Sequence, residues 1–280
     1  MVAEADGHPR ALVLALHGGG MTAGYFHGSA HPDLSLLTLG RSLGFSVVAL
    51  DRPGYGHSSA AFPAGQSLRE QTTAVFEALD SFTAAHPIGA GVFIVGHSMG
   101  LTLALHMAAT PRGRDLLGID GSGAIFHYQP GIVTSESPSD ITTEASLNNS
   151  RRLREIYWGA DRLYPPGTFE PGVRPTAAVP TTEARESAIW TAVLPSIAAE
   201  VRVPYQLSVS EYERCWRCTD ADLAEYSGLF TAAPVMEIRR QPAAGHNMSL
   251  GWAARSYHLS ALAFAERCLY AQKSALDQPY

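Results

Sequence analysis

Residues 92–109 constrain the fold of this 280-residue chain more than any other stretch does. Four apolar residues at 92–95, three of them β-branched, predict a short buried strand. The strand stops at Gly96-His97-Ser98-Met99-Gly100, and the leucine- and alanine-rich run that follows is typical of a buried helix. The order of strand, sharp turn and helix places Ser98 at the turn.

Ser98 is the candidate nucleophile. A G-x-S-x-G motif between a strand and a helix is typical of a nucleophile elbow, in which a strained turn exposes the serine hydroxyl. Gly96 and Gly100 leave the space that such a turn requires. The first turn of the following helix would aim backbone N–H groups, including that of Met99, at a substrate oxyanion. The competing interpretation is an ordinary glycine-rich turn, so the hypothesis depends on a base and an acid elsewhere in the chain.

The length allows one large α/β domain, and the composition fits a soluble enzyme with much buried surface. Hydrophobic residues make up 46% of the chain and charged residues 16%, which suits a large core and excludes a disordered protein. The net charge of −6 offers no basic stripe, so we expect no nucleic-acid partner. The first apolar run, residues 11–16, is too short for a signal peptide or a membrane span, so we expect a cytoplasmic protein without membrane contact.

The cysteine pattern indicates no metal or redox role. The three cysteines are too few for a disulfide framework. Cys215 and Cys218 form a C-x-x-C, but no second pair completes a zinc site and no βαβ redox context surrounds them. We expect two incidental thiols.

Strand and helix patterns alternate along most of the chain. Further strands are expected at residues 11–16, 45–50, 116–119, 205–210 and 235–239. Helices are expected at residues 34–43, 67–85, 219–230 and 252–272, and capping boxes begin two of them, at Ser67 with Glu70 and at Thr219 with Asp222. The alternation predicts an α/β fold with a mostly parallel sheet and helices on both faces, built from residues 1–126 and 204–280.

Residues 127–203 interrupt this alternation. Eight prolines and many Ser, Thr and Arg residues break any strand pattern, while residues 147–158 and 182–199 favour helices. Because the stretch is inserted between two strands, it predicts a helical cap, or lid, over the site. Its aromatic residues, Tyr157, Trp158, Tyr164 and Trp190, either line an apolar pocket or hold the cap on the body.

His246 is the candidate base, since a serine hydroxyl needs a proton acceptor within hydrogen-bond reach. Among eleven histidines, His246 follows the last expected strand, at the carboxyl edge of the sheet where Ser98 also emerges. His97 adjoins Ser98, but we expect its side chain to leave the turn in another direction. His106 lies within the following helix.

A carboxylate must hold the tautomer of this histidine and stabilise its charged form. In the chain order nucleophile, acid, histidine, the acid lies after a strand between Ser98 and His246. Glu213 follows the strand at 205–210 and is the preferred acid; Glu211 and Asp120 are the alternatives.

Two loops after strands carry further polar groups. The loop His17-Gly18-Gly19-Gly20 is the candidate for a second oxyanion donor, through Gly19 or Gly20. Asp51 and Arg52 begin the other loop, and we expect them to hold that loop together by a salt bridge and backbone hydrogen bonds.

These motifs together resemble the α/β-hydrolase superfamily over nearly the whole chain. The resembling segments are the loop at 17–20, residues 51–58, the turn at 96–100, Val203-Pro204 and Gly245-His246-Asn247. In the family's strand-Gly-x-x-Asp pattern Glu213 takes the position of the aspartate, and a glutamate there departs from the pattern. The resemblance is to capped serine esterases and thioesterases. It implies that Ser98 attacks an ester or thioester carbonyl, that His246 takes its proton, that Met99 with Gly19 or Gly20 binds the oxyanion, and that no cofactor takes part.

On this basis we expect a hydrolase for a small to medium hydrophobic acyl substrate, and secondary metabolism is one setting for such an enzyme. A serine at the turn argues against the epoxide hydrolase and haloalkane dehalogenase branches, which attack through a carboxylate. Two alternatives remain open: a non-hydrolytic enzyme on the same fold, such as a C–C bond lyase or a cofactor-free oxygenase, and a ligand-binding protein. A homodimer also stays open.

Overall fold

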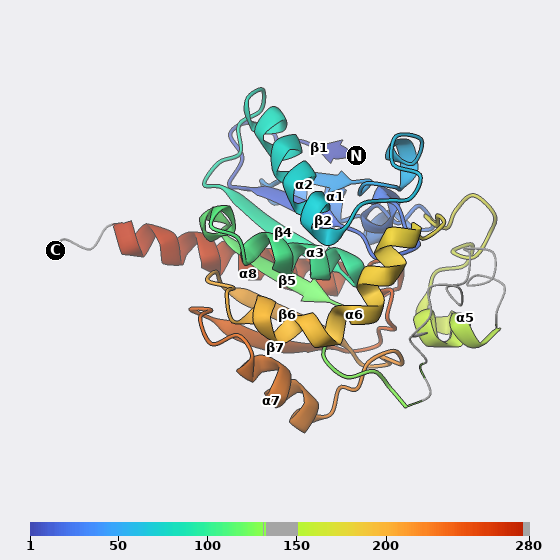
Figure 1. Ribbon diagram of the computed structural model, residues 1–280. Helices are drawn as coiled ribbons and strands as arrows, with labels where there is room; N and C mark the ends of the chain where they lie inside the picture. Colours follow the sequence, from blue (N-terminus) through green and yellow to red (C-terminus); the bar gives the residue numbers. More distant parts are fainter. Residues whose placement is uncertain (131, 133–150, 277–280) are drawn as a thin grey trace.

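The computed structural model describes residues 1–130, 132 and 151–276. These residues form a seven-stranded sheet in the order β1-β3-β2-β4-β5-β6-β7 (Figure 1). The strands are β1 (Val2–Ala3), β2 (Leu12–Leu16), β3 (Ser46–Leu50), β4 (Val92–His97), β5 (Gly118–Ser122), β6 (Tyr205–Ser210) and β7 (Met236–Gln241). The helices are α1 (Leu36–Ser42), α2 (Leu68–Thr83), α3 (Met99–Ala108), α5 (Arg151–Tyr157), α6 (Thr181–Ala198), α7 (Asp220–Gly228) and α8 (Ala254–Leu276).

The sheet is parallel from β3 to β7, and only β1 pairs antiparallel, with β3. The mostly parallel α/β fold is therefore confirmed. Strand β4 lies in the middle of the sheet, between β2 and β5, so the turn that follows it lies at the centre of the carboxyl edge. Parallel sheets of this kind bind ligands at that edge.

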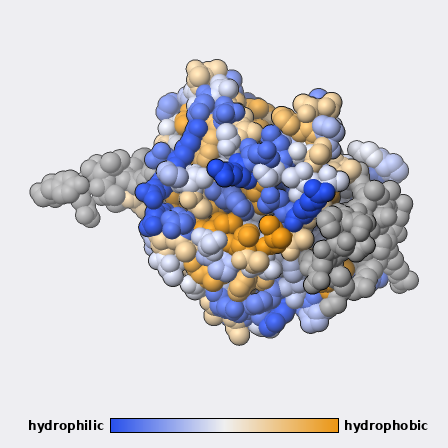
Figure 2. Space-filling view, in the orientation of Figure 1, coloured by the Kyte–Doolittle hydropathy of each residue, from blue (hydrophilic) through white to orange (hydrophobic). Residues whose placement is uncertain are grey.

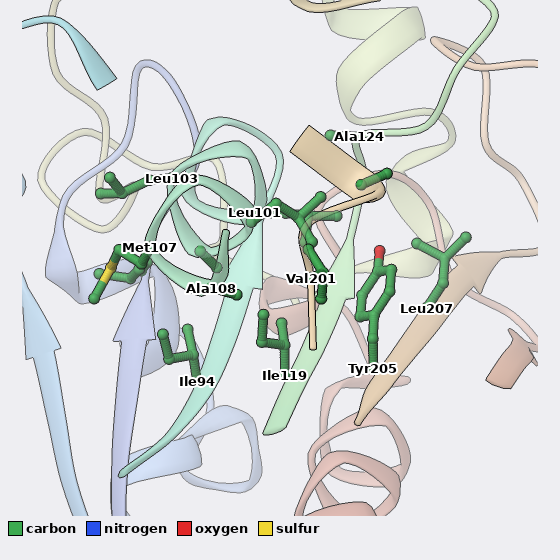
Figure 3. Close-up of a cluster of buried hydrophobic side chains, with 14 of the residues drawn as sticks. Ile94, Leu101, Leu103, Met107, Ala108, Ile119, Ala124, Val201, Tyr205 and Leu207 are labelled. Atoms are coloured by element: carbon green, nitrogen blue, oxygen red, sulfur yellow. The ribbon is translucent and has the colours of Figure 1, made fainter. Parts of the chain in front are cut away.

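Helices cover both faces of the sheet because successive side chains of a strand point to opposite faces. Leu12, Leu14 and Ile94 join the hydrophobic cluster under α2, α3, α6 and α7. Their neighbours Val13 and Phe93 join the cluster under α1 and α8. Figure 3 shows the first cluster, in which side chains of α3 meet those of β4, β5 and β6.

Most predicted elements are confirmed, and both predicted capping boxes are present, at Ser67 and Thr219. Strand β5 was misplaced by the sequence pattern: it covers Gly118–Ser122, so Asp120 lies inside the strand rather than after it. The pattern also missed β1, which has two residues. The expected helix at 147–158 is observed as α5 from Arg151, and residues 147–150 lie outside the described part of the chain.

The described part of 127–203 contacts the carboxyl edge and the core. Helix α5 and the segment after it lie beyond the carboxyl ends of the strands, and α6 returns along the sheet (Figure 1). Trp190, Leu194 and Ala198 of α6 belong to the core cluster shared with α3. On its outer side α6 exposes Ile189, and Figure 2 shows a hydrophobic patch near this helix on a face of otherwise mixed hydropathy. The limits of a cap at 127 and 203 stay a prediction.

Within the described residues, no helix has both the length and the apolar character needed to cross a membrane.

Candidate active site

Ser98 stands at the sharp turn between β4 and α3. Its backbone has φ 51° and ψ −120°, a conformation that a residue with a side chain seldom adopts. Its N–H donates to the carbonyl of Ser122 at the end of the neighbouring strand β5, at 2.7 Å. The turn is thus strained and also fixed from outside, as a nucleophile elbow requires.

The two glycines of the motif are required by close backbone approach. A Cβ on Gly96 would lie 2.9 Å from the carbonyl oxygen of Gly100. A Cβ on Gly100 would overlap the carbonyl oxygen of Leu16, where β2 ends. Only glycines therefore allow α3 to begin directly against the end of β2.

His246 and Glu213 form a buried hydrogen-bonded pair on neighbouring loops. His246 follows β7 and Glu213 follows β6, and both side chains are almost fully buried. The Nδ1 atom of His246 lies 3.1 Å from Oε1 and 3.0 Å from Oε2 of Glu213. A proton on Nδ1 donates to this carboxylate, which leaves Nε2 as the proton acceptor.

Glu213 stays ionised although it is buried. Burial acts to raise the pKa of this carboxyl, but the adjacent His246 charge and the hydrogen bonds from His246, the Cys215 N–H and the Ser210 hydroxyl outweigh it and lower the pKa. The Cys215 N–H donates to Oε1 at 2.9 Å. The backbone N–H of Cys215, in the C-x-x-C motif, thus stabilises the Glu213 carboxylate, a role that the cysteine spacing did not predict.

The alternative acids lie elsewhere. Glu211 is exposed, and its carboxylate accepts from the N–H of Ala243 at 2.7 Å. Asp120 is buried within β5 and accepts from Gln206 at 2.6 Å and from Ser208 at 3.0 Å. Among the described residues, neither carboxylate is hydrogen-bonded to His246, so geometry favours Glu213.

His97 packs against the candidate base. Its ring lies 4.9 Å from that of His246 and is stacked at 4.6 Å on Tyr25. Its Nδ1 atom is 3.1 Å from the hydroxyl of Ser122. Burial and the neighbouring His246 hold the pKa of His97 well below its usual range, so its ring is neutral where it packs on His246.

The backbone after β5 closes in on both imidazole rings. A Cβ on Gly123 would lie 2.7 Å from Cε1 of His97 and 3.0 Å from Cε1 of His246. This places His246 beside the residue that precedes Ser98. In the described part of the chain no hydrogen bond joins Ser98 to His246, and such bonds commonly tighten only when substrate is bound.

The glycine loop after β2 lies against the elbow. A Cβ on Gly18 would be 3.0 Å from Cβ of Ser98, and one on Gly19 would be 3.4 Å from Cγ of Met99. The Gly20 N–H is already donated to the hydroxyl of Tyr55, at 3.2 Å. Of the two predicted donors, Gly19 is therefore the one that fits beside Met99.

Arg52 has a different partner from the expected one. It is fully buried and forms an ion pair with Glu183 of α6, far along the chain, rather than within its own loop. Asp51 also reaches outside its own loop, since its carboxylate accepts from the N–H of Ala23, after β2, at 2.8 Å. The expected backbone hydrogen bonds within the loop are present, because the N–H of Tyr55 donates to the carbonyl of Arg52 at 2.9 Å. The sequence spacing could not reveal a partner 131 residues away.

Of the four aromatic residues left open in 127–203, Tyr157 contacts the candidate base. Its ring lies 5.3 Å from that of His246, and its carbonyl accepts from the Asn247 side chain at 2.9 Å. Trp158 and Tyr164 pack on each other, and Trp190 donates from Nε1 to the carbonyl of Ile125 within the core. Tyr157 is thus placed to border a bound substrate.

Cys215 and Cys218 carry free thiols. The described ranges contain no group of three or more His, Cys, Asp or Glu side chains arranged to hold a metal ion.

Comparison with known families matches residues 12–267 to the model of the alpha/beta hydrolase family. The chain belongs to this family. No curated protein sequence matches it. Its fold is similar to that of MenH from S. aureus, with a TM-score of 0.66 at 15% identity, covering 96% of this chain and 98% of the other. It is also similar to the N-acyl homoserine lactonase AidH, with a TM-score of 0.64 at 17% identity over 96% and 92% of the two chains.

A third similar structure is the monoacylglycerol lipase of Paleococcus ferrophilus, with a TM-score of 0.60 at 16% identity over 96% and 97% of the two chains. At these identities the likeness concerns the fold, and the chemistry of this alpha/beta hydrolase family member must come from its own residues.

Proposed function

We propose that the chain is a serine hydrolase that cleaves an ester or thioester through an acyl-enzyme on Ser98. The observation that carries this proposal is the buried His246–Glu213 pair at 3.0 Å, packed on His97, the residue that precedes a serine held in a strained elbow. A carboxylate in this place orients the imidazole and stabilises the charged form that it takes on during the reaction.

In the proposed reaction Nε2 of His246 accepts the proton of the Ser98 hydroxyl while Oγ forms a bond to the acyl carbon. The N–H groups of Gly19 and Met99 bind the oxyanion that develops on the carbonyl oxygen. The bond to the leaving group then breaks, and His246 protonates the departing alcohol or thiol. Water, deprotonated by His246, repeats the sequence and releases the acid with Ser98 restored.

The groups around the site favour a hydrophobic acyl chain. Tyr157 borders His246, and Met99 lies beside Gly19. We further propose that α5 and the segment after it act as a cap over this site. Two of the three similar structures are a lactonase and a monoacylglycerol lipase by name, so a lactone and a monoacylglycerol belong in a substrate panel with a simple ester and a thioester.

The test begins with covalent labelling. Incubation with a fluorophosphonate followed by intact mass should show one adduct on the wild type and none on Ser98→Ala, while Ser81→Ala, on an exposed turn of α2, keeps the adduct. The same Ser98→Ala change should lower turnover of the best ester at least about 10³-fold.

A folded wild type that forms no adduct and hydrolyses no member of the panel would contradict this proposal. Consumption of a substrate with oxygen uptake, or tight binding of a ligand that returns unchanged, would then point to the other functions considered from the sequence.

A further inference from the structure

The loop that carries the candidate oxyanion donor is held by a buried charged network rather than by apolar packing. The network consists of Arg52 and Tyr55 from the loop after β3, Gln71 of α2 and Glu183 of α6. Arg52 and Glu183 are fully buried, and their guanidinium and carboxylate form two contacts, one of them at 3.0 Å. This pair reaches the glycine loop by several hydrogen bonds.

Arg52 fixes the start of the glycine loop. Its backbone N–H donates to Nε2 of His17 at 3.1 Å, and its Nε donates to the carbonyl of His17 at 2.8 Å. The Nδ1–H of His17 then donates to the carbonyl of Gly18 at 2.8 Å. Burial and the adjacent Arg52 charge hold the pKa of His17 well below its usual range, so this relay keeps one tautomer.

Tyr55 fixes the end of the same loop. Its hydroxyl accepts from the N–H of Gly20 at 3.2 Å and donates to Oε1 of Glu183 at 2.6 Å. The carbonyl of Gly20 accepts from the N–H of Ala177 at 2.9 Å. Both backbone groups of Gly20 are thus held from residues 175–183. Ala177 binds its carbonyl directly, and Glu183 binds the Tyr55 hydroxyl that accepts its N–H.

Glu183 itself lies close to the candidate donor. A Cβ on Gly19 would be 3.4 Å from Oε1 of Glu183 and 3.4 Å from Cγ of Met99. A buried ion pair costs several kcal/mol of desolvation per ion, and apolar residues of similar volume are often as stable. The Arg52–Glu183 pair is therefore better explained by the loop position that it fixes than by added stability. Oxyanion donors act only when their positions are fixed before the substrate reacts.

We propose that Glu183 is a positioning residue that, through Arg52 and Tyr55, fixes the backbone of residues 17–20 so that the Gly19 N–H points at the oxyanion. Helix α6 thereby completes the oxyanion hole formed on the other side by Met99. This inference rests on the proposed function, because it concerns the oxyanion of the same acyl transfer.

The test compares Tyr55→Phe and Glu183→Gln with the wild type on one ester substrate. Tyr55→Phe removes the hydroxyl that links Gly20 to Glu183 and keeps the ring. Tyr226→Phe is the matched control, since its hydroxyl is buried at 2.8 Å from that of Tyr205, at the other end of β6. Fluorophosphonate labelling taken to completion gives the fraction of active molecules, so kcat is expressed per reactive Ser98.

We expect Tyr55→Phe and Glu183→Gln each to lower kcat per reactive serine about tenfold with KM within about twofold, and to slow phosphonylation similarly, because a displaced donor weakens only the transition state. The double variant should lose no more than the larger single effect, since both changes act through one chain. Tyr226→Phe should stay within about twofold of wild type.

A merely structural role would lower the melting temperature and the labelled fraction but leave kcat per reactive serine unchanged, and that result would overturn the inference. If Glu183→Gln does not fold, an unchanged kcat per reactive serine in Tyr55→Phe overturns the inference by itself. A wild type without adduct or turnover overturns the proposed function itself, and is seen before any variant is compared.

Discussion

At residue scale, Glu213 reaches His246 with a side chain one methylene longer than that of the aspartate in the family's pattern. Both of its oxygens lie within 3.1 Å of Nδ1 of His246, and its own N–H turns back to the carbonyl of Ser210. The position after a strand and the strand-Gly-x-x-Asp register favoured Glu213 over Glu211 from the sequence, but the turn that brings its carboxylate to His246 is seen only in the structure.

Replacing Glu213 by glutamine should remove the charge and keep the shape. The amide can donate to Nδ1 of His246, which favours the wrong tautomer and leaves the imidazolium unpaired, so kcat should fall by about 10²–10⁴-fold. Glu211→Gln, two residues earlier and exposed, should change kcat less than about twofold. The comparison is made by ester turnover per titrated active site, and equal losses in the two variants would argue against Glu213 as the acid.

Asp120 makes stability depend on pH in the opposite sense from a paired carboxylate. Burial raises its pKa to about 7, although Gln206 and Ser208 donate to it and Arg239 favours its charge. The folded protein therefore holds a proton that the unfolded chain has lost at pH 5. The free energy of unfolding should fall as pH rises from about 4 to about 7, by roughly 1.4 kcal/mol per unit at most.

Asp120→Asn removes this titration. Between pH 5 and pH 8 the variant should lose on the order of 2 kcal/mol less stability than the wild type, measured by urea unfolding at both pH values. Asp33→Asn, at an exposed carboxyl, should leave the difference between the two pH values unchanged. A wild-type difference that Asp120→Asn does not alter would contradict a buried proton at this position.

At the scale of elements, the features predicted best are those that neighbouring residues decide. The capping boxes of α2 and α7 formed as expected because Ser67 and Thr219 find their partners three residues away. Strand β1 was missed because its two residues are paired only by contact with β3. The limits of β5 were misjudged because Asp120 and Ser122 look like loop residues, yet both are buried inside the strand with polar partners from β6 and from His97.

Helix α6 shows that the sequence pattern predicts an element but not the distant partners of its residues. Its pattern predicted a helix from residue 182, and the structure has one at Thr181–Ala198. Nothing in that pattern marks Glu183 as different from Glu186 or the other charges of the helix. Its role comes from its partners Arg52 and Tyr55, which lie more than a hundred residues earlier and are brought to it by the tertiary fold.

At the scale of the whole molecule, residues 151–203 are joined to the rest of the chain in several places. Trp190 and Leu194 lie in the central core, the N–H of Thr22 donates to the carbonyl of Pro175 at 2.8 Å, and that of Trp252 donates to Leu163 at 2.9 Å. The Arg52–Glu183 pair is a further buried link. A cap on a flexible tether would show few such contacts.

These links predict that residues 151–203 unfold together with the rest of the protein, in one transition. In guanidinium, the midpoint from far-UV circular dichroism should coincide with that from tryptophan fluorescence, because Trp158 and Trp190 lie in the 151–203 stretch while Trp216 and Trp252 lie outside it. A phosphonate adduct on Ser98 should shift both unfolding midpoints by the same amount, since the site contacts residues 151–203 as well as the rest of the chain. An earlier fluorescence transition that the adduct leaves in place would mean that residues 151–203 open independently, and Glu183 could then hold the glycine loop only in the closed form.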